Sequence, residues 1–311
     1  MEKIEIQKKG SSGSVVFQKE NVVEKRGPAS KILPEIWAYQ RLQSLLGEGD
    51  KTFPRILDVY EDQQGEVIAL ILERLKGDYD LEEYILATAD EDERLGHITT
   101  VIRSTLNRLN NWQQLFSSVS EDPHLLLREI LEGIEFLQGK FGEKEQCFNL
   151  AELYQLLSED RTKSFLLEGV VLGPCHRDLG TNNIWPLFDG NVRFFDPHWQ
   201  LTGSSTTSRG HVVLDLTSLR VNLERLQAAR RRRGLAKSLP LKLIDDYLRV
   251  MIREKRFREE IYLLALLRRY LSFVACRCDF CLAPQRRFLF DLMKRRSVAT
   301  YHQLIRRVKE I

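Results

Sequence analysis

The stretch Cys-His-Arg-Asp-Leu-Gly-Thr-Asn-Asn at residues 175–183, followed thirteen residues later by Asp196, constrains this chain more than any other feature. It places the carboxylate of Asp178 and the carboxamide of Asn183 five positions apart. Phosphoryl transfer from a magnesium nucleotide needs an acid that receives the acceptor's proton and oxygen ligands that hold the metal against the phosphates. Asp178 is therefore the candidate base, and Asn183 and Asp196 are the candidate Mg²⁺ ligands.

The segment between the two candidate ligands, residues 184–195, reads as a β-hairpin that turns at Asp189-Gly190. A hairpin holds its two ends side by side. Two ligands of one metal ion require that arrangement, so the spacing and the expected local structure agree.

The first 75 residues predict a small antiparallel sheet with one helix. Proline suits the first turn of a helix, and apolar residues at helical spacing follow Pro34, so we expect the helix to begin there. Short runs bounded by turn residues predict the strands. The expected strands cover residues 4–7, 14–19, 22–26, 55–60 and 67–72.

After Gly77 the pattern becomes helical. We expect helices after Pro123 and over 149–157, a short strand over 170–172, and helices from His211 almost to the end, interrupted near Gly234, Pro240 and Pro284. The chain is therefore predicted to be an α+β protein with a small antiparallel sheet in residues 1–75 and a helical part over 76–311. The second part contains the candidate catalytic loop over 175–183.

Composition sets limits on location and partners. No apolar run approaches the ~20 residues of a membrane span, the N-terminus lacks the apolar core of a signal peptide, and five cysteines do not suggest a disulfide framework. A cytoplasmic protein is the expectation. From residue 201 onward 25 Lys and Arg stand against 10 Asp and Glu, whereas 22 stand against 34 before it. A basic region of this kind attracts anionic ligands, unless it only reflects arginine-rich, solvated helix faces.

The motif His-x-Asp-x-x-x-x-Asn followed by an Asp resembles the protein-kinase-like fold, and most closely its aminoglycoside phosphotransferase and choline kinase branch. Asp196 is followed by proline, not by the Phe-Gly of protein kinases. The 103 positions between Glu73 and His176 leave room for the helical insertion of small-molecule kinases. Residues 210–216 look like the branch's segment after the catalytic loop. Arg177 departs from the glycine usual in aminoglycoside phosphotransferases.

The resemblance implies a nucleotide-binding lobe over 1–75 and a helical lobe over 76–311 that carries the catalytic loop and the acceptor site. It also implies ATP and Mg²⁺ as cofactors and roles for further residues. His176 would hold the catalytic loop by hydrogen bonds, and Asp215 would either anchor that loop or be an acid at a helix start. Lys25, with Lys19 as a rival, would contact the α- and β-phosphates. Glu35 would either pair with that lysine or stabilise the helix dipole.

The rest of the nucleotide site also follows from the resemblance. Gly10 and Gly13 would lie in the loop that covers the phosphates, because glycines let backbone amides approach an anion closely. Glu73 and Leu75 lie in the linker after the fifth strand, where backbone groups would bind adenine.

The resemblance suggests a hydroxyl of a non-protein molecule as the phosphate acceptor. The basic C-terminal region favours an anionic one: a phosphorylated sugar, a lipopolysaccharide-type glycan or an RNA. The alternative is a pseudokinase, that is, a nucleotide-binding scaffold without activity, or an RNA-binding module that uses the basic lobe.

Two further motifs have ordinary explanations. Cys276, Cys278 and Cys281 lack a nearby fourth ligand for zinc, so buried cysteines in a helix are the expected reading. The run Arg230 to Arg233 is expected to be a solvated connection and not a phosphate site.

Overall fold

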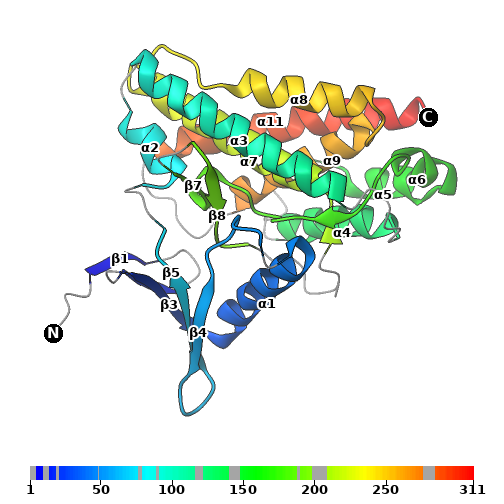
Figure 1. The fold of residues 1–311 in the computed structure, drawn as a ribbon. Helices are drawn as coiled ribbons and strands as arrows, with labels where there is room; N and C mark the ends of the chain where they lie inside the picture. Colours follow the sequence, from blue (N-terminus) through cyan, green and yellow to red (C-terminus); the bar gives the residue numbers. More distant parts are fainter. Residues whose placement is uncertain are drawn as a thin grey trace.

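A computed structural model gives the fold of the chain. It describes residues 5–9, 14–18, 21–47, 49–75, 79–88, 91–115, 122–139, 148–187, 190–197, 209–275 and 284–311. A small sheet with one helix lies below a larger group of helices in Figure 1. One continuous apolar core runs through both parts.

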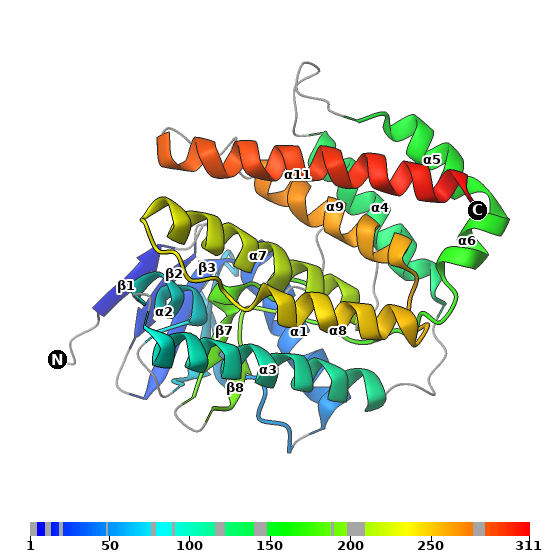
Figure 2. The ribbon, with the colours of Figure 1, turned by 90° about the horizontal axis from the view of Figure 1, so that it is seen from above.

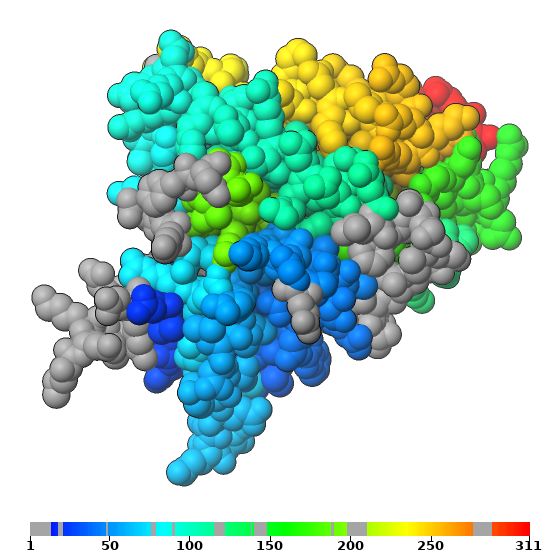
Figure 3. All heavy atoms as spheres, viewed as in Figure 1, coloured from blue at the N-terminus to red at the C-terminus, as the bar shows by residue number. Residues whose placement is uncertain are grey.

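The N-terminal part is a five-stranded antiparallel sheet with the order β1-β2-β3-β5-β4. Its strands are β1 (Glu5–Lys9), β2 (Val15–Gln18), β3 (Val22–Pro28), β4 (Ile56–Glu61) and β5 (Val67–Glu73). All five expected strands are confirmed with small shifts at their ends. The β4–β5 hairpin projects from the body of the molecule, as Figure 3 shows.

The helix α1 (Ala29–Leu46) begins five residues before the predicted start, so the expectation that Pro34 opens the helix was wrong. Proline in the second turn removes one main-chain hydrogen bond. Burial of an apolar face offsets that cost, because Ile32, Ile36 and Tyr39 lie in the core. Glu35 consequently lies in the second helical turn, where the helix dipole acts weakly.

The C-terminal part is helical. Its helices are α2 (Leu81–Ala87), α3 (Asp92–Leu115), α4 (His124–Gln138), α5 (Leu150–Ser158), α6 (Asp160–Leu166), α7 (Val212–Arg232), α8 (Leu241–Arg253), α9 (Glu259–Ala275) and α11 (Pro284–Lys309). Figure 2 shows them from above. Helix α9 packs against α4, α7 and α11 and so forms the centre of this part. None of the helices among the described residues is long and apolar enough to cross a membrane.

Two pairs of short antiparallel strands flank the catalytic loop. β7 (Ile184–Pro186) pairs with β8 (Val192–Phe194) as the predicted hairpin. β6 (Gly173–Pro174) pairs with β9 (Arg209–Gly210). The strand predicted over 170–172 was wrong. A turn at Gly169 (φ +77°) precedes these residues, and Leu172 is buried in the core without a strand partner.

The prediction of a solvated run over 230–233 holds for 231–233 but was wrong for Arg230. Its buried guanidinium donates to the carbonyl oxygens of Ile85 (3.0 Å) and Thr88 (2.6 Å). The last carbonyls of a helix have no partner within it, so Arg230 supplies donors for the end of α2. This contact joins α7 to α2 beside the catalytic loop.

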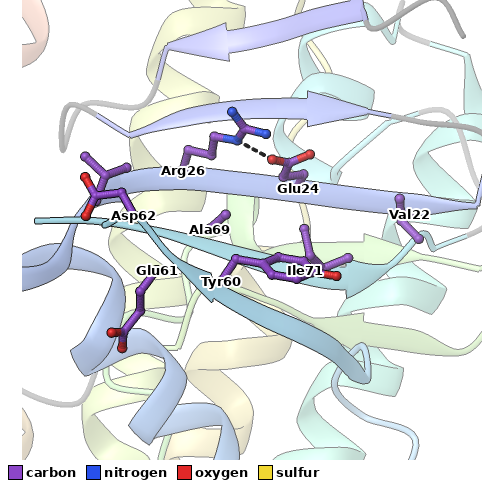
Figure 4. A pocket seen from close by; sticks show the side chains of 9 residues that line it. Val22, Glu24, Arg26, Tyr60, Glu61, Asp62, Ala69 and Ile71 are labelled. Atoms are coloured by element: carbon purple, nitrogen blue, oxygen red, sulfur yellow. Dashed lines mark hydrogen bonds and ion pairs between the residues drawn. The ribbon is translucent and has the colours of Figure 1, made fainter. Parts of the chain in front are cut away.

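A hollow of about 440 Å³ lies on the outer face of the sheet (Figure 4). Glu24, Arg26 and Ile71 are among the side chains around it. Successive side chains of a strand point to opposite faces, so Lys25 and the buried Leu70 and Leu72 belong to the other face, towards α1. The hollow is therefore separated by the sheet from the groups that the catalytic motif brings together.

The N-cap of α7 makes stability depend on pH. His211 is fully buried, its Nδ1 accepts from the backbone N–H of Val213 (3.2 Å), and its ring meets the Phe257 ring edge to face. Burial lowers the pKa of His211 from 6.5 to about 3. The folded chain therefore keeps this ring neutral, while the unfolded chain takes up a proton as the pH falls below 6.5.

We expect the free energy of unfolding to fall by about 2 kcal/mol on this account between about pH 7.5 and about pH 5. The loss should continue towards pH 3. His211→Asn keeps an N-cap acceptor without the titrating ring and should lose less stability over the same interval. Urea unfolding of both proteins at the two pH values measures the difference. Equal acid sensitivity would show that His211 does not carry the effect.

Candidate active site

His176 fixes the catalytic loop at its start. Its backbone N–H donates to Asp215 Oδ2 (2.9 Å), and its Nε2 lies 2.9 Å from the carbonyl oxygen of Phe195. The imidazole stacks on the Phe53 ring, 6.1 Å between centroids. His176 is fully buried. It thus ties the loop to the residue before Asp196.

Asp215 lies in the first turn of α7 and also binds the loop backbone, so both alternatives that the resemblance left open describe its position. Burial raises the pKa of this carboxyl to about 7, although the N–H groups of His176 and Arg177 act in the opposite direction. Because Asp215 is buried and its carboxylate accepts hydrogen bonds from backbone N–H groups of the catalytic loop, it holds that loop firmly.

Arg177 takes the position next to Asp178 with φ +66°, a conformation that non-glycine residues rarely adopt. Its buried side chain pairs with Glu129 of α4 (Nε to Oε1, 2.9 Å). Burial alone would lower the pKa of Arg177, but the Glu129 carboxylate raises it. The pair therefore attaches the catalytic loop to α4 and holds a strained backbone in place.

Asn183 and Asp196 lie at adjoining ends of the β7–β8 hairpin. The Asn183 Nδ2 donates to the carbonyl oxygen of Asp178 (2.8 Å), and the Phe195 N–H donates to the Asn183 carbonyl (3.1 Å). The Asp196 N–H donates to the Tyr39 hydroxyl (2.8 Å). Asp196 adopts φ +59°. The three motif residues are thus brought to one place by the loop and the hairpin.

Lys25 and Glu35 reach the same place from the sheet and from α1. Lys25 Nζ lies 2.6 Å from Glu35 Oε2 and 2.5 Å from Asp196 Oδ1. Burial would lower the pKa of Lys25, but the two carboxylates raise it well above its ordinary value. Burial and the Asp196 charge raise the pKa of Glu35 despite its lysine partner. Two carboxylates therefore share one ammonium at the end of the hairpin.

The side-chain oxygens of Asn183 and Asp196 suit Mg²⁺, which is commonly bound by few protein ligands together with phosphate, better than they suit a metal ion coordinated only by protein side chains. A carboxamide oxygen and a carboxylate are hard ligands, and Mg²⁺ is usually bound by one or two carboxylates together with substrate phosphates. Within the described ranges no group of three or more His, Cys, Asp or Glu side chains is arranged to hold a metal ion. Asn183 and Asp196 would hold Mg²⁺ only together with phosphate oxygens.

Glu73 ends β5 and joins the sheet to the hairpin through its side chain. It pairs with Arg55 (2.8 Å) and with Arg193 of β8. Partial burial would raise the pKa of Glu73, but hydrogen bonds from the two arginines hold it below its ordinary value. Leu75 follows two residues later, past the strand. The side-chain link to Arg193 was not predicted from the sequence.

Several predicted site residues lie outside the described residues. These are Gly10 and Gly13 of the expected phosphate-covering loop, the rival Lys19, and Cys276, Cys278 and Cys281. Cys175, which precedes His176, is described and buried.

Arg269 of α9 is a residue of the site that the sequence did not indicate. Its Nη1 lies 2.6 Å from Asp178 Oδ1, and its side chain is 19% exposed. An arginine in an apolar helical run carries no motif of its own. Only the packing of α9 beside the catalytic loop reveals it.

Comparison with known proteins gives the same fold. The sequence matches no protein-family model and no curated protein. The structure is similar to choline kinase LicA from Streptococcus pneumoniae, with 12% identity over 96% of this chain and 94% of that chain and a TM-score of 0.55. It is also similar to ADP-bound aminoglycoside phosphotransferase APH(2'')-Ib, with 12% identity over 96% and 94% and a TM-score of 0.52.

A putative aminoglycoside phosphotransferase from Ralstonia eutropha JMP134 matches over 100% of this chain and 93% of that chain, with 11% identity and a TM-score of 0.52. At these identities the likeness establishes the fold. It confirms the predicted two-lobed, kinase-like α+β class and agrees with the branch that the sequence resembles. The boundary at residues 75 and 76 stays a prediction.

Proposed function

We propose that this chain transfers the γ-phosphate of Mg-ATP to a hydroxyl group of a non-protein, anionic acceptor. The observation that carries the proposal is the convergence of Asp178, Asn183 and Asp196 with the Lys25–Glu35 pair. Asp178 and Asn183 come from the catalytic loop and Asp196 from the end of the β7–β8 hairpin, while the lysine and its glutamate partner come from β3 and α1. Phosphoryl transfer uses each of them.

In the proposed mechanism Asp178 orients the acceptor hydroxyl and accepts its proton as the acceptor oxygen bonds to the γ-phosphorus. The bond between the γ-phosphorus and the bridging oxygen breaks, and ADP leaves with the electron pair. Lys25, held by Glu35, contacts the α- and β-phosphates. Asn183 and Asp196 would hold Mg²⁺, which would neutralise part of the phosphate charge.

The nucleotide would lie between the sheet and the hairpin. Backbone groups of Glu73 and Leu75 would bind adenine, and the loop with Gly10 and Gly13 would cover the phosphates. The similar structures support a nucleotide: APH(2'')-Ib is described as ADP-bound, and LicA has been solved with AMP. The Glu73–Arg193 pair would keep the adenine-binding linker close to the metal ligands.

The anionic acceptor is supported by charge. Arg269, which lies 2.6 Å from Asp178, belongs to the region after residue 201, where 25 Lys and Arg stand against 10 Asp and Glu. A small phosphorylated molecule fits this charge. Electrostatic complementarity favours it over a polycation.

The test is transfer of label from γ-labelled Mg-ATP to a heat-inactivated cell extract, separated afterwards into protein, RNA, glycolipid and small-molecule pools. We expect label in the small-molecule pool, dependent on Mg²⁺ and lost in Asp178→Asn. Asp246→Asn removes an exposed, ion-paired carboxylate of α8 and should retain transfer. Label in another pool would correct the acceptor class. Equal label above background would contradict the role of Asp178. Background label with both proteins would contradict the kinase proposal and favour a scaffold.

A further inference from the structure

Two arginines line the side of the catalytic loop that faces away from the sheet. Arg269 of α9 contacts Asp178, as described above. Arg225 of α7 donates through Nη2 to Glu82 Oε2 (2.5 Å), and Glu82 also accepts from the Thr181 hydroxyl (3.2 Å). Arg269 thus contacts the loop that carries the candidate base directly, and Arg225 is linked to it through Glu82.

The two guanidinium groups lie against the same aromatic ring. The Cζ of Arg269 is 5.2 Å and the Cζ of Arg225 is 5.7 Å from the centroid of Phe273. Cations over an aromatic face are stabilised by the ring quadrupole. Phe273 therefore gathers two like charges beside Asp178, although these charges repel each other.

Both arginines have unused hydrogen-bonding capacity. The Nε of Arg225 and the Nε of Arg269 are buried and find no hydrogen-bond acceptor among the described residues. Arg268, next to Arg269 in α9, is 5% exposed, and its Nε and Nη2 also find no acceptor there. Burial lowers the pKa of Arg268, the Glu129 charge raises it, and the Arg269 and Arg177 charges lower it. Buried donors without acceptors cost free energy. An anion would meet the two arginines at the exposed parts of their side chains, 22% for Arg225 and 19% for Arg269.

We propose that Arg225 and Arg269 form the subsite for a phosphate monoester group of the acceptor and so direct its hydroxyl to Asp178. The proposal rests on the proposed function and names the substrate class. Arginine suits a phosphate because its planar fork donates two parallel hydrogen bonds. A cationic acceptor would meet two guanidinium groups at this subsite and is disfavoured.

The subsite also controls the base. When the phosphate group binds, Arg269 gives up its ion pair with Asp178 Oδ1 at least in part and donates hydrogen bonds to the phosphate oxygens instead. Asp178 then accepts the proton of the acceptor hydroxyl while that oxygen bonds to the γ-phosphorus. Arg269 is in this way a specificity-determining residue.

The experiment measures binding of inorganic phosphate, by calorimetry, to protein saturated with a non-hydrolysable Mg-ATP analogue that fills the γ-phosphate position. We expect the wild type to bind phosphate and the double variant Arg225→Gln/Arg269→Gln to bind it about tenfold or more weakly. Arg249→Gln removes an exposed, ion-paired arginine of α8 and should match the wild type. Choline, tested in the same way, should bind more weakly than phosphate.

The outcomes separate the subsite from the kinase proposal. Failure of the wild type to bind the Mg-ATP analogue would contradict the proposed function. Binding of the analogue without phosphate binding, or equal phosphate affinity in the double variant, would overturn the subsite alone, as would tighter binding of choline. Thermal unfolding checks that the double variant is folded. If it is not, Arg225→Lys and Arg269→Lys replace it, because lysine keeps the charge but not the fork and should weaken phosphate binding several-fold.

Discussion

Asp196→Asn is expected to lower the rate of phosphate transfer by at least about 10³-fold, because the proposed metal ligand supplies several kcal/mol of charge stabilisation. The same change removes one of the two carboxylates that hold Lys25. Because Asp196 is the proposed metal ligand, the affinity of the variant for nucleotide should no longer depend on Mg²⁺. Calorimetric titration with ADP, with and without Mg²⁺, measures the second effect, and label transfer measures the first.

Asp246→Asn is the matched control for this prediction. It removes a carboxylate of the same kind from an exposed site on α8, where Lys242 and Arg249 surround it. Its transfer rate and Mg²⁺ dependence should stay at the wild-type level. If Asp196→Asn still bound ADP in an Mg²⁺-dependent way, Asp196 would not be a metal ligand.

Glu129→Gln is expected to destabilise the fold by about 3–5 kcal/mol, the usual cost of leaving a buried charge without its partner. Glu129 neutralises Arg177 (2.9 Å), and its charge also acts on the buried Arg268. Glutamine keeps the size of the side chain but removes the charge. Urea unfolding measures the change in free energy.

Glu152→Gln provides the comparison for Glu129→Gln. Glu152 pairs with Lys309 at an exposed position, where an ion pair contributes little. Its replacement should leave the unfolding midpoint nearly unchanged. Equal stability of Glu129→Gln and the wild type would show that the pair does not hold the strained catalytic loop in place.

The sequence predicts those parts of the site that depend on local spacing. Asp178, Asn183 and Asp196 are linked by a five-residue step and a hairpin, so their proximity follows from short-range geometry. Lys25 was implied by the family resemblance, with Lys19 as its rival. The strands of the sheet follow from turn residues and period-two patterns.

The partners of these residues could not be predicted in the same way. The tertiary fold sets how their elements pack. It brings Glu129 and Arg269 to the loop and Arg193 to the sheet. Glu129 and Arg269 lie in periodic helical runs where an isolated charge looks like a solvated position. The start of α1 was misplaced for a related reason, because tertiary burial outweighed the local effect of Pro34.

Phosphorus NMR of the reaction with the small-molecule pool tests the central claim most directly, because it counts both products in one sample. The account predicts one new phosphate monoester for each ADP formed by the wild type. Asp178→Asn should form neither product at a comparable rate, although it still binds Mg-ADP. Formation of ADP with inorganic phosphate and no monoester, or equal product from the wild type and Asp178→Asn, would contradict the account.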